Sequence, residues 1–287
     1  MVWENSIDCC VFGVESRSPH RFSFTIEKLV SEMDANLVDK AVIHYAGSDE
    51  IEDHGSFLND LSSFPARFRG LMKVHSKAPA LVSYMNRVFE HRQIVGFIVD
   101  SISDNLNPFD VVEIEKLEAY KIWSTADQLG AVLVIDVQVA EAHIVPYFLE
   151  RFPNVKVIAP RSLVFRTVAS EVSCIDVPPR INVDMPTESK FTIQCWSEFP
   201  NLYVCLSGYY SFSKEAWPYN DIRRWFEPEN FVDRFGADRI MWGSEFPWTS
   251  NVPGYDRTLD FVKNRLQYVT ADQQKKIARD TALNLLF

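Results

Sequence analysis

The chain has 287 residues, of which 47% are hydrophobic, and it carries a formal net charge of −10. Nucleic acid and anionic membrane surfaces both require a basic face on the protein, so this charge argues against either partner. The first eight residues contain two acids and no basic segment before an apolar run, so we expect neither a signal peptide nor a transmembrane helix.

Short apolar runs alternate with longer amphipathic runs along the whole chain, which is typical of repeated strand–helix units around a parallel sheet. The predicted strands lie near residues 6–12, 40–45, 69–74, 94–100, 131–137, 155–160, 202–207 and 239–244. The predicted helices lie near residues 25–36, 54–63, 78–91, 112–129, 140–151, 188–199, 222–235, 256–267 and 271–286. Eight such units predict an α/β fold of the (β/α)₈ TIM-barrel type, with room for distortion in the irregular stretch 161–186, which we interpret as an active-site loop.

The length fits one barrel of roughly 250 residues better than two smaller domains. No Gly/Ser-rich or Pro-rich linker divides the chain, so we expect a single domain over residues 1–287. A homodimer is compatible with a barrel of this size, although no sequence feature fixes the oligomeric state.

The chain has five cysteines, an odd and scattered set that favours reduced thiols and a cytoplasmic location over a disulfide framework. Cys9 and Cys10 are adjacent on the first predicted strand. Because side chains alternate along a strand, we expect these two to point to opposite faces.

Polar or ionisable residues follow all eight predicted strands. In a barrel the carboxyl ends of the strands meet at one face, where ligands bind, so these residues are the candidate site. The candidate binding residues are Cys10, His44, Lys73, His75, Ser207, Tyr209, Tyr210 and Trp248, and the candidate catalytic residues are Asp136, Arg161 and Glu245. Each could instead be a structural polar group, and for Arg161 that alternative is a salt bridge to Asp136.

The most informative stretch is residues 239–248, Arg-Ile-Met-Trp-Gly-Ser-Glu-Phe-Pro-Trp. It reads as a short apolar strand that delivers the Glu245 carboxylate where the chain turns out of the sheet. Three aromatic residues surround that carboxylate in the sequence, which favours a partly enclosed site with a raised pKa over a solvated loop acid.

This stretch resembles the last-strand signature of the amidohydrolase-2 family of the amidohydrolase superfamily, in which an Asp occupies the position of Glu245. The resemblance extends through residues 199–210 and 254–256 to the closing residues 284–287, and it is greatest for the branch that includes 2-pyrone-4,6-dicarboxylate lactonase. In that family the acid is a metal ligand or the catalytic base. The resemblance therefore implies one of these roles for Glu245.

The family's usual metal-binding histidines are replaced in this chain. Its first strand normally carries Ile-Asp-x-His-x-His, and here Cys10 and Phe12 stand at the two histidine positions. The histidine expected after the fifth strand is also absent around Asp136, and Pro160 stands in the sixth-strand motif. A thiolate with two carboxylates and no imidazole is a poor zinc set, so we expect no cofactor. The alternative is zinc or manganese held by His44 and His75 with the carboxylates.

The leading hypothesis is a metal-independent hydrolase of a lactone or similar carbonyl substrate, a small molecule, with Glu245 as general base. Cationic groups would hold the developing oxyanion. Two alternatives remain open: a lyase or cyclase, of decarboxylase or dehydratase type, acting on a small aromatic or polyketide-like acid, and a non-catalytic barrel that binds a ligand. For Cys10, a buried inert thiol is favoured over a nucleophile, because nothing in the sequence supplies an activating base.

Overall fold

The computed structural model describes residues 5–13, 25–45, 54–103, 113–167, 180–182, 195–227, 229 and 231–287. In the part of the chain so described, no helix is long and apolar enough to cross a membrane.

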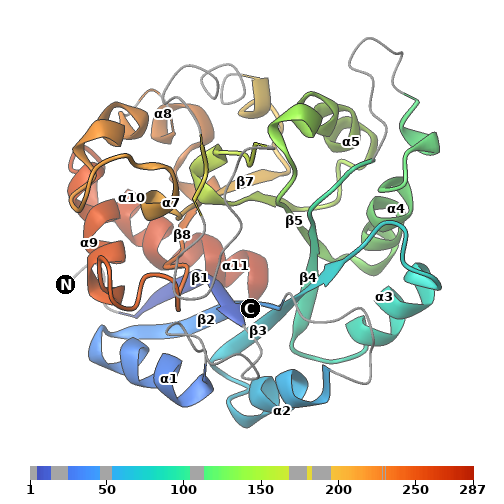
Figure 1. The fold of residues 1–287 in the computed structure, drawn as a ribbon, viewed down its shortest axis with the longest axis horizontal. Helices are drawn as coiled ribbons and strands as arrows, with labels where there is room; N and C mark the ends of the chain where they lie inside the picture. Colours follow the sequence, from blue (N-terminus) through green and yellow to red (C-terminus); the bar gives the residue numbers. More distant parts are fainter. Residues whose placement is uncertain are drawn as a thin grey trace.

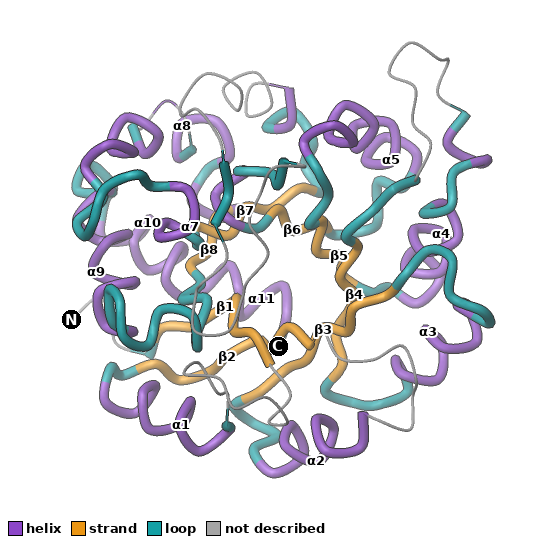
Figure 2. Tube along the Cα trace, viewed as in Figure 1, coloured by secondary structure: helices purple, strands orange, loops and turns teal. Residues whose placement is uncertain are grey.

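Eight parallel strands form one sheet in the order β1 to β8, and each strand pairs with the next along the chain. Their bounds are Ser6–Gly13 (β1), Val38–Tyr45 (β2), Phe68–Val74 (β3), Ile94–Val99 (β4), Val132–Ile135 (β5), Val157–Ala159 (β6), Leu202–Leu206 (β7) and Ile240–Trp242 (β8). The ring of strands encloses a central space and the helices surround it (Figures 1 and 2). The prediction of a TIM barrel is confirmed.

Most helices lie outside the strands, and the last helix packs against the residues inside the barrel. The α-helices are Ile26–Ala35 (α1), Gly55–Ser63 (α2), Leu81–Phe89 (α3), Tyr120–Leu129 (α4), Val145–Arg151 (α5), Tyr209–Phe212 (α7), Val232–Phe235 (α8), Tyr255–Arg265 (α9), Ala271–Lys275 (α10) and Thr281–Leu286 (α11). Shorter 3₁₀ turns include Ile114–Lys116 (η2), Val139–Ile144 (η3), Arg161–Leu163 (η4), Asn220–Phe226 (η5) and Ala237–Arg239 (η7), and Lys276–Asp280 (η8) is a π-helical turn.

The helix predicted at 222–235 is wrong as a single element. The structure has a 3₁₀ helix, η5, and a separate four-residue helix, α8. Pro228 stands between them in the sequence, and proline lacks the backbone N–H that a continuous helix needs. The predicted helix 112–129 is likewise shorter, because α4 begins only at Tyr120. Of the predicted helix 188–199, residues 188–194 lie outside the described residues.

The core has two layers, one between the strands and the helices and one inside the barrel. The interior layer is a separate cluster of buried apolar residues that includes Ile7, Val42, Leu71, Ile98, Val134, Ile158, Cys205 and Met241, one from each strand. Ala282 and Leu286 of α11 join the same cluster. The barrel is therefore filled by side chains rather than hollow.

The interior layer fixes which residues reach the barrel mouth. Side chains alternate along a strand, so the residue two positions after an interior residue also faces inward. By this count Val42, Leu71, Ile98, Val134 and Cys205 are followed at the strand ends by a polar ring of His44, Lys73, Asp100, Asp136 and Ser207. The polar side chains therefore lie at the mouth of the barrel, and the apolar side chains lie below them in its interior.

The first strand departs from simple alternation. Its pairing with β2 shifts between Asp8 and Val11, so three steps on β1 match two on β2. Such a bulge turns an extra side chain to one face. Cys9 and Cys10 both pack in the interior cluster, and the prediction that they face opposite sides is wrong.

Candidate active site

Glu245 lies just beyond β8, where the chain seals the barrel against β1. Its backbone N–H donates to the Cys10 carbonyl at 2.7 Å, and the Phe12 N–H donates to the Phe246 carbonyl at 2.7 Å. The backbone of Glu245 is left-handed, with φ of 59°, a conformation that costs energy for a residue with a side chain. The side chain is buried, with 2% of the residue exposed.

Two hydroxyl groups hold the Glu245 carboxylate. The Ser207 hydroxyl donates to Oε1 at 2.8 Å and the Tyr210 hydroxyl donates to Oε2 at 2.9 Å. Burial raises the pKa of Glu245 above its usual 4.5, while Arg161 and then the two hydroxyls act to lower it. The burial of Glu245 thus shifts its pKa toward neutral pH, where a carboxylate is a better general base, and the two hydroxyls fix its orientation.

Arg161 supplies the buried positive charge of the site. It begins η4, in which Arg161, Ser162 and Leu163 all have left-handed backbones, with φ of 47°, 55° and 62°. The turn is held by the Trp225 indole N–H, which donates to the Ser162 carbonyl at 3.0 Å, and by the Arg161 N–H, which donates to Ser207 Oγ at 3.1 Å. Three successive strained residues are typical of a backbone shaped for function.

The Arg161 guanidinium binds the Asp136 carboxylate through both of its terminal nitrogens. The structural alternative for Arg161, a salt bridge to Asp136, is therefore present in the structure. Burial lowers the pKa of Arg161, and the charge of Glu245 acts against that effect. The Nε of Arg161 is buried and has no hydrogen-bond partner among the described residues.

Gly208 explains how Arg161 and Glu245 come so close. A side chain at this position would begin 2.6 Å from Arg161 Cγ and 2.8 Å from Glu245 Oε1. Its φ of +73° also favours glycine. Only a residue without a Cβ lets the carboxylate and the arginine share this space.

A second group of charges continues the ring from β3 to β5. Lys73 Nζ lies 2.6 Å from Asp100 Oδ2, and His75 Nδ1 lies 3.8 Å from Asp100 Oδ1. Arg166 Nε lies 3.2 Å from Asp136 Oδ1, which makes it the second guanidinium on that acid. Lys73 and His75 also border a cavity of about 560 Å³ that extends to α3.

Cys10 and His44 face each other beside Glu245. The Cys10 sulfur lies 3.9 Å from His44 Nδ1, and His44 Nε2 lies 3.0 Å from the Cys9 carbonyl, which makes Nε2 the protonated nitrogen. Burial lowers the pKa of His44 to about 4. Burial, followed by the charge of Glu245, raises the pKa of the Cys10 thiol. A protonated thiol near a neutral imidazole favours the inert role for Cys10.

The remaining two candidates lie at the edge of this arrangement. The Tyr209 ring packs away from the carboxylate, 4.0 Å from the Phe261 ring centroid and 5.4 Å from that of Phe226. Trp248 is half-buried, and its backbone N–H donates to the Glu245 carbonyl at 3.0 Å. The structure therefore groups Ser207, Tyr210 and Arg161 around Glu245, and places Tyr209 in the wall behind them.

Asp8 is a buried carboxylate that sequence reasoning missed. Its Oδ1 accepts from the Ser244 N–H at 2.8 Å and from the Cys10 N–H at 3.2 Å, and its Oδ2 accepts from the Tyr255 hydroxyl at 2.9 Å. Asp8 therefore fixes the residue before Glu245 and the residue whose carbonyl holds Glu245. The sequence did contain an indication of its importance, because Asp8 is an acid inside an apolar strand. Burying an acid costs free energy unless the acid is fully hydrogen-bonded.

We expect Asp8→Asn to change how stability depends on pH. Burial raises the pKa of Asp8 from 3.8 to about 6, against its hydrogen bonds. The folded state therefore holds this proton more tightly than the unfolded chain, and the wild type loses stability as pH rises through that window, by about 3 kcal/mol in all. The asparagine side chain does not titrate and keeps the Oδ1 acceptor. Urea unfolding from about pH 3 to pH 7 should show the variant gaining on the wild type by that amount, and a constant difference would contradict the assignment.

The candidate metal ligands that the structure describes at the mouth are each held by protein partners and are not grouped around one point. His44 is turned to Cys10 and the Cys9 carbonyl, Asp136 is bound by two guanidiniums, and Glu245 is bound by two hydroxyls. Among the residues that the structure describes, no three His, Cys, Asp or Glu side chains are grouped so that they could share an ion. The positive charge beside Glu245 is instead that of Arg161.

Comparison with solved structures identifies similar barrels. An amidohydrolase from Burkholderia multivorans with bound zinc has a TM-score of 0.73 and 15% identity, with 98% of each chain covered. A probable 2-pyrone-4,6-dicarboxylic acid hydrolase from Acinetobacter baumannii with citric acid bound has a TM-score of 0.70 and 14% identity, over 98% of this chain and 99% of that one. A dihydroxybenzoic acid decarboxylase from a Polaromonas species, with manganese and the inhibitor 2-nitroresorcinol bound, has a TM-score of 0.65 and 13% identity, over 99% and 97%.

At these identities the likeness shows the fold alone. No curated protein sequence matches the chain. A family model described as Amidohydrolase matches residues 178–287. The sequence similarity to that family therefore covers the part of the chain that carries Ser207, Tyr210 and Glu245.

Proposed function

We propose that the protein is a hydrolase of amidohydrolase type that opens a lactone or a similar activated carbonyl substrate without a metal, using Glu245 as general base. The observation that carries this proposal is the pairing of a buried, doubly hydrogen-bonded carboxylate with a buried guanidinium at the barrel mouth. These are the two groups that ester hydrolysis needs, a proton acceptor and a cation for the developing negative charge.

In the proposed reaction Glu245 removes a proton from a water molecule as the water oxygen attacks the carbonyl carbon. The carbonyl oxygen becomes negative and is stabilised by the positive charge of Arg161. When the tetrahedral intermediate collapses, the ring C–O bond breaks and the departing oxygen takes the proton from Glu245. Water is consumed, and a hydroxy acid is formed. Ser207 and Tyr210 keep the carboxylate oriented throughout.

Cationic and acidic side chains are paired with each other at the mouth. Arg161, Arg166 and Lys73 face the mouth or its rim, and each already contacts an acid, Asp136 or Asp100. Arginine forms two-point contacts with carboxylates, so a carboxylate on the substrate would compete with Asp136 for the terminal nitrogens of Arg161.

A decarboxylase is the second candidate. Burial raises the pKa of Glu245, so the same side chain could deliver a proton to a ring carbon as carbon dioxide leaves. The likeness to a dihydroxybenzoic acid decarboxylase fold is compatible with this candidate. A barrel that only binds a ligand is the third candidate.

The test is an activity screen of protein that has been purified without a histidine tag and analysed for metals. Lactones and hydroxybenzoic acids, each with and without a ring carboxylate, are incubated with and without a chelator. Chelator-resistant ring opening, with release of a proton and no carbon dioxide, is the expected result. Release of carbon dioxide would support the decarboxylase instead, chelator-sensitive turnover would overturn metal independence, and inactivity on every compound would favour the binding barrel.

A further inference from the structure

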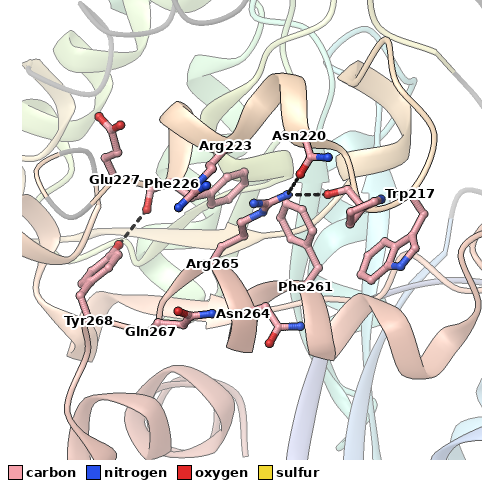
Figure 3. A pocket seen from close by; sticks show the side chains of 11 residues that line it. Trp217, Asn220, Arg223, Phe226, Glu227, Phe261, Asn264, Arg265, Gln267 and Tyr268 are labelled. Atoms are coloured by element: carbon pink, nitrogen blue, oxygen red, sulfur yellow. Dashed lines mark hydrogen bonds between the residues drawn. The ribbon is translucent and has the colours of Figure 1, made fainter.

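A second cavity lies on the flank of the barrel, between η5 and the C-terminal end of α9 (Figure 3). Its volume is about 470 Å³, which is within the usual range for small-molecule sites. Glu245, Arg161 and Asp136 do not line it. The cavity is therefore separate from the candidate active site.

Arg265 is fixed in this cavity. Its guanidinium lies over the Phe261 ring, 5.1 Å from the ring centroid. One terminal nitrogen donates to the Pro218 carbonyl at 2.5 Å and lies 3.3 Å from Asn220 Oδ1 (Figure 3). These contacts use one nitrogen and hold the planar group in place, so binding a ligand would cost little further ordering.

Arg223 lines the same cavity, and neither positive charge is paired with an acid in the part of the chain that the structure describes. Among the described residues no carboxylate lies within ion-pair distance of either guanidinium, and this includes Glu227, which also lines the cavity. Burial lowers the pKa of Arg265, and the nearby positive charge of Arg223 lowers it further. A bound anion would remove this repulsion.

Four aromatic residues form one part of the lining, here called the aromatic wall, and the rest of the lining, apart from the two arginines, consists of Pro218, Asn220, Glu227, Asn264 and Gln267. Trp217, Phe226, Phe261 and Tyr268 line the cavity, and Phe226 and Phe261 are buried. Their rings come from η5, from α9 and from the segments beside them, so they border the cavity on more than one side (Figure 3). Such a wall suits a flat apolar body, because aromatic rings stack or meet edge to face.

We propose that this cavity binds a small aromatic carboxylate, with its carboxylate at Arg223 and Arg265 and its ring against the aromatic wall. Two guanidiniums supply the charge-assisted hydrogen bonds that a carboxylate prefers. The site does not depend on the reaction at Glu245. The Tyr209 ring packs against Phe226 and Phe261 from the side of the barrel, which separates the two sites.

The test is calorimetric titration of the full chain with 2-naphthoate and with its neutral analogue 2-naphthamide. Arg223→Gln removes one charge from the cavity and leaves Arg265 and its contacts unchanged. The matched control is Arg224→Gln, which alters the next residue of η5, a residue that does not line the cavity. Both arginines are exposed, so neither change threatens the core.

We expect 2-naphthoate to bind the wild type and the Arg224 variant equally, and to bind the Arg223 variant roughly tenfold more weakly or worse. The amide should bind weakly to all three proteins. Equal affinity of naphthoate for wild type and Arg223→Gln would overturn the proposal, because the anion would then be bound elsewhere, the barrel mouth included. Equal affinity for the acid and the amide, or no binding at all, would overturn it as well.

Discussion

Glu245→Gln should lower kcat by about 10²- to 10⁴-fold on the substrate that the activity screen identifies, with little change in fold. Glutamine keeps an acceptor for one of the two hydroxyls, Ser207 and Tyr210, and nearly fills the same volume, but it cannot take a proton from water. The measurement is steady-state kinetics together with thermal unfolding of both proteins.

The matched control is Glu90→Gln at the C-terminal end of α3, an exposed acid that follows the last helical residue. It removes the same charge and should leave turnover unchanged. The pH profile gives an independent check: a base must be ionised, so kcat/KM should fall as pH falls through the raised pKa of Glu245. Undiminished turnover in the Glu245→Gln variant would remove Glu245 from the mechanism, and in a ligand-binding barrel affinity would be nearly unchanged.

Arg161→Met should lower kcat/KM by roughly 10²- to 10³-fold, the usual effect of removing a group that stabilises the oxyanion. Methionine retains the unbranched apolar stem and loses the charge and all of the donors. Asp136 keeps Arg166 at 3.2 Å, so the carboxylate is not left without a cation. The kinetic loss should therefore exceed what the change in stability explains, and both are measured on the same preparation.

Two further variants identify the cause of that loss. Arg161→Lys keeps the charge and should recover part of the rate, although a lysine cannot make the two-point contact with Asp136. Arg166→Gln removes the other guanidinium from Asp136 and leaves Arg161 beside Glu245, so kcat should change by less than about tenfold. If kcat of the Arg166 variant fell as far as kcat of the Arg161→Met variant, the role assigned to Arg161 would be wrong.

The sequence predicted the barrel well because its signal is periodic. Every predicted strand overlaps an observed one, and β2, predicted at 40–45, differs only at its beginning, Val38. A buried strand gives a short apolar run in the sequence, and the helix after it gives apolar residues at the spacing of the helical repeat. Both patterns can be recognised without the structure. The helix predicted at 222–235 failed where a proline interrupts the pattern.

The site residues that lie at the carboxyl ends of the strands could be predicted from the sequence. His44, Lys73, Asp136 and Ser207 project at the mouth because each lies two residues beyond an interior position. Asp8 lay too early in its strand for that rule, and its importance comes from three hydrogen bonds to residues distant in the sequence or across the bulge.

Finer choices depended on backbone angles that the sequence does not reveal. Tyr209 and Tyr210 are chemically alike neighbours, yet only Tyr210 donates to Glu245. The left-handed backbone of Gly208 and the short helix α7 that follows it determine which of the two tyrosines points toward Glu245. Arg166 was missed for a related reason, since the irregular stretch 161–186 has no period from which to judge direction.

The N–H group of Glu245 and the carbonyl of Cys10 form part of the seam that joins the last strand to the first. A functional side chain that is carried by a surface loop can move while the scaffold stays intact. Here local opening of the seam would misplace the carboxylate at once, so loss of catalytic geometry and loss of barrel closure become a single cooperative event. Amide hydrogen exchange at Glu245 would then report on both together, and drift at this position during evolution would be constrained by folding as well as by chemistry.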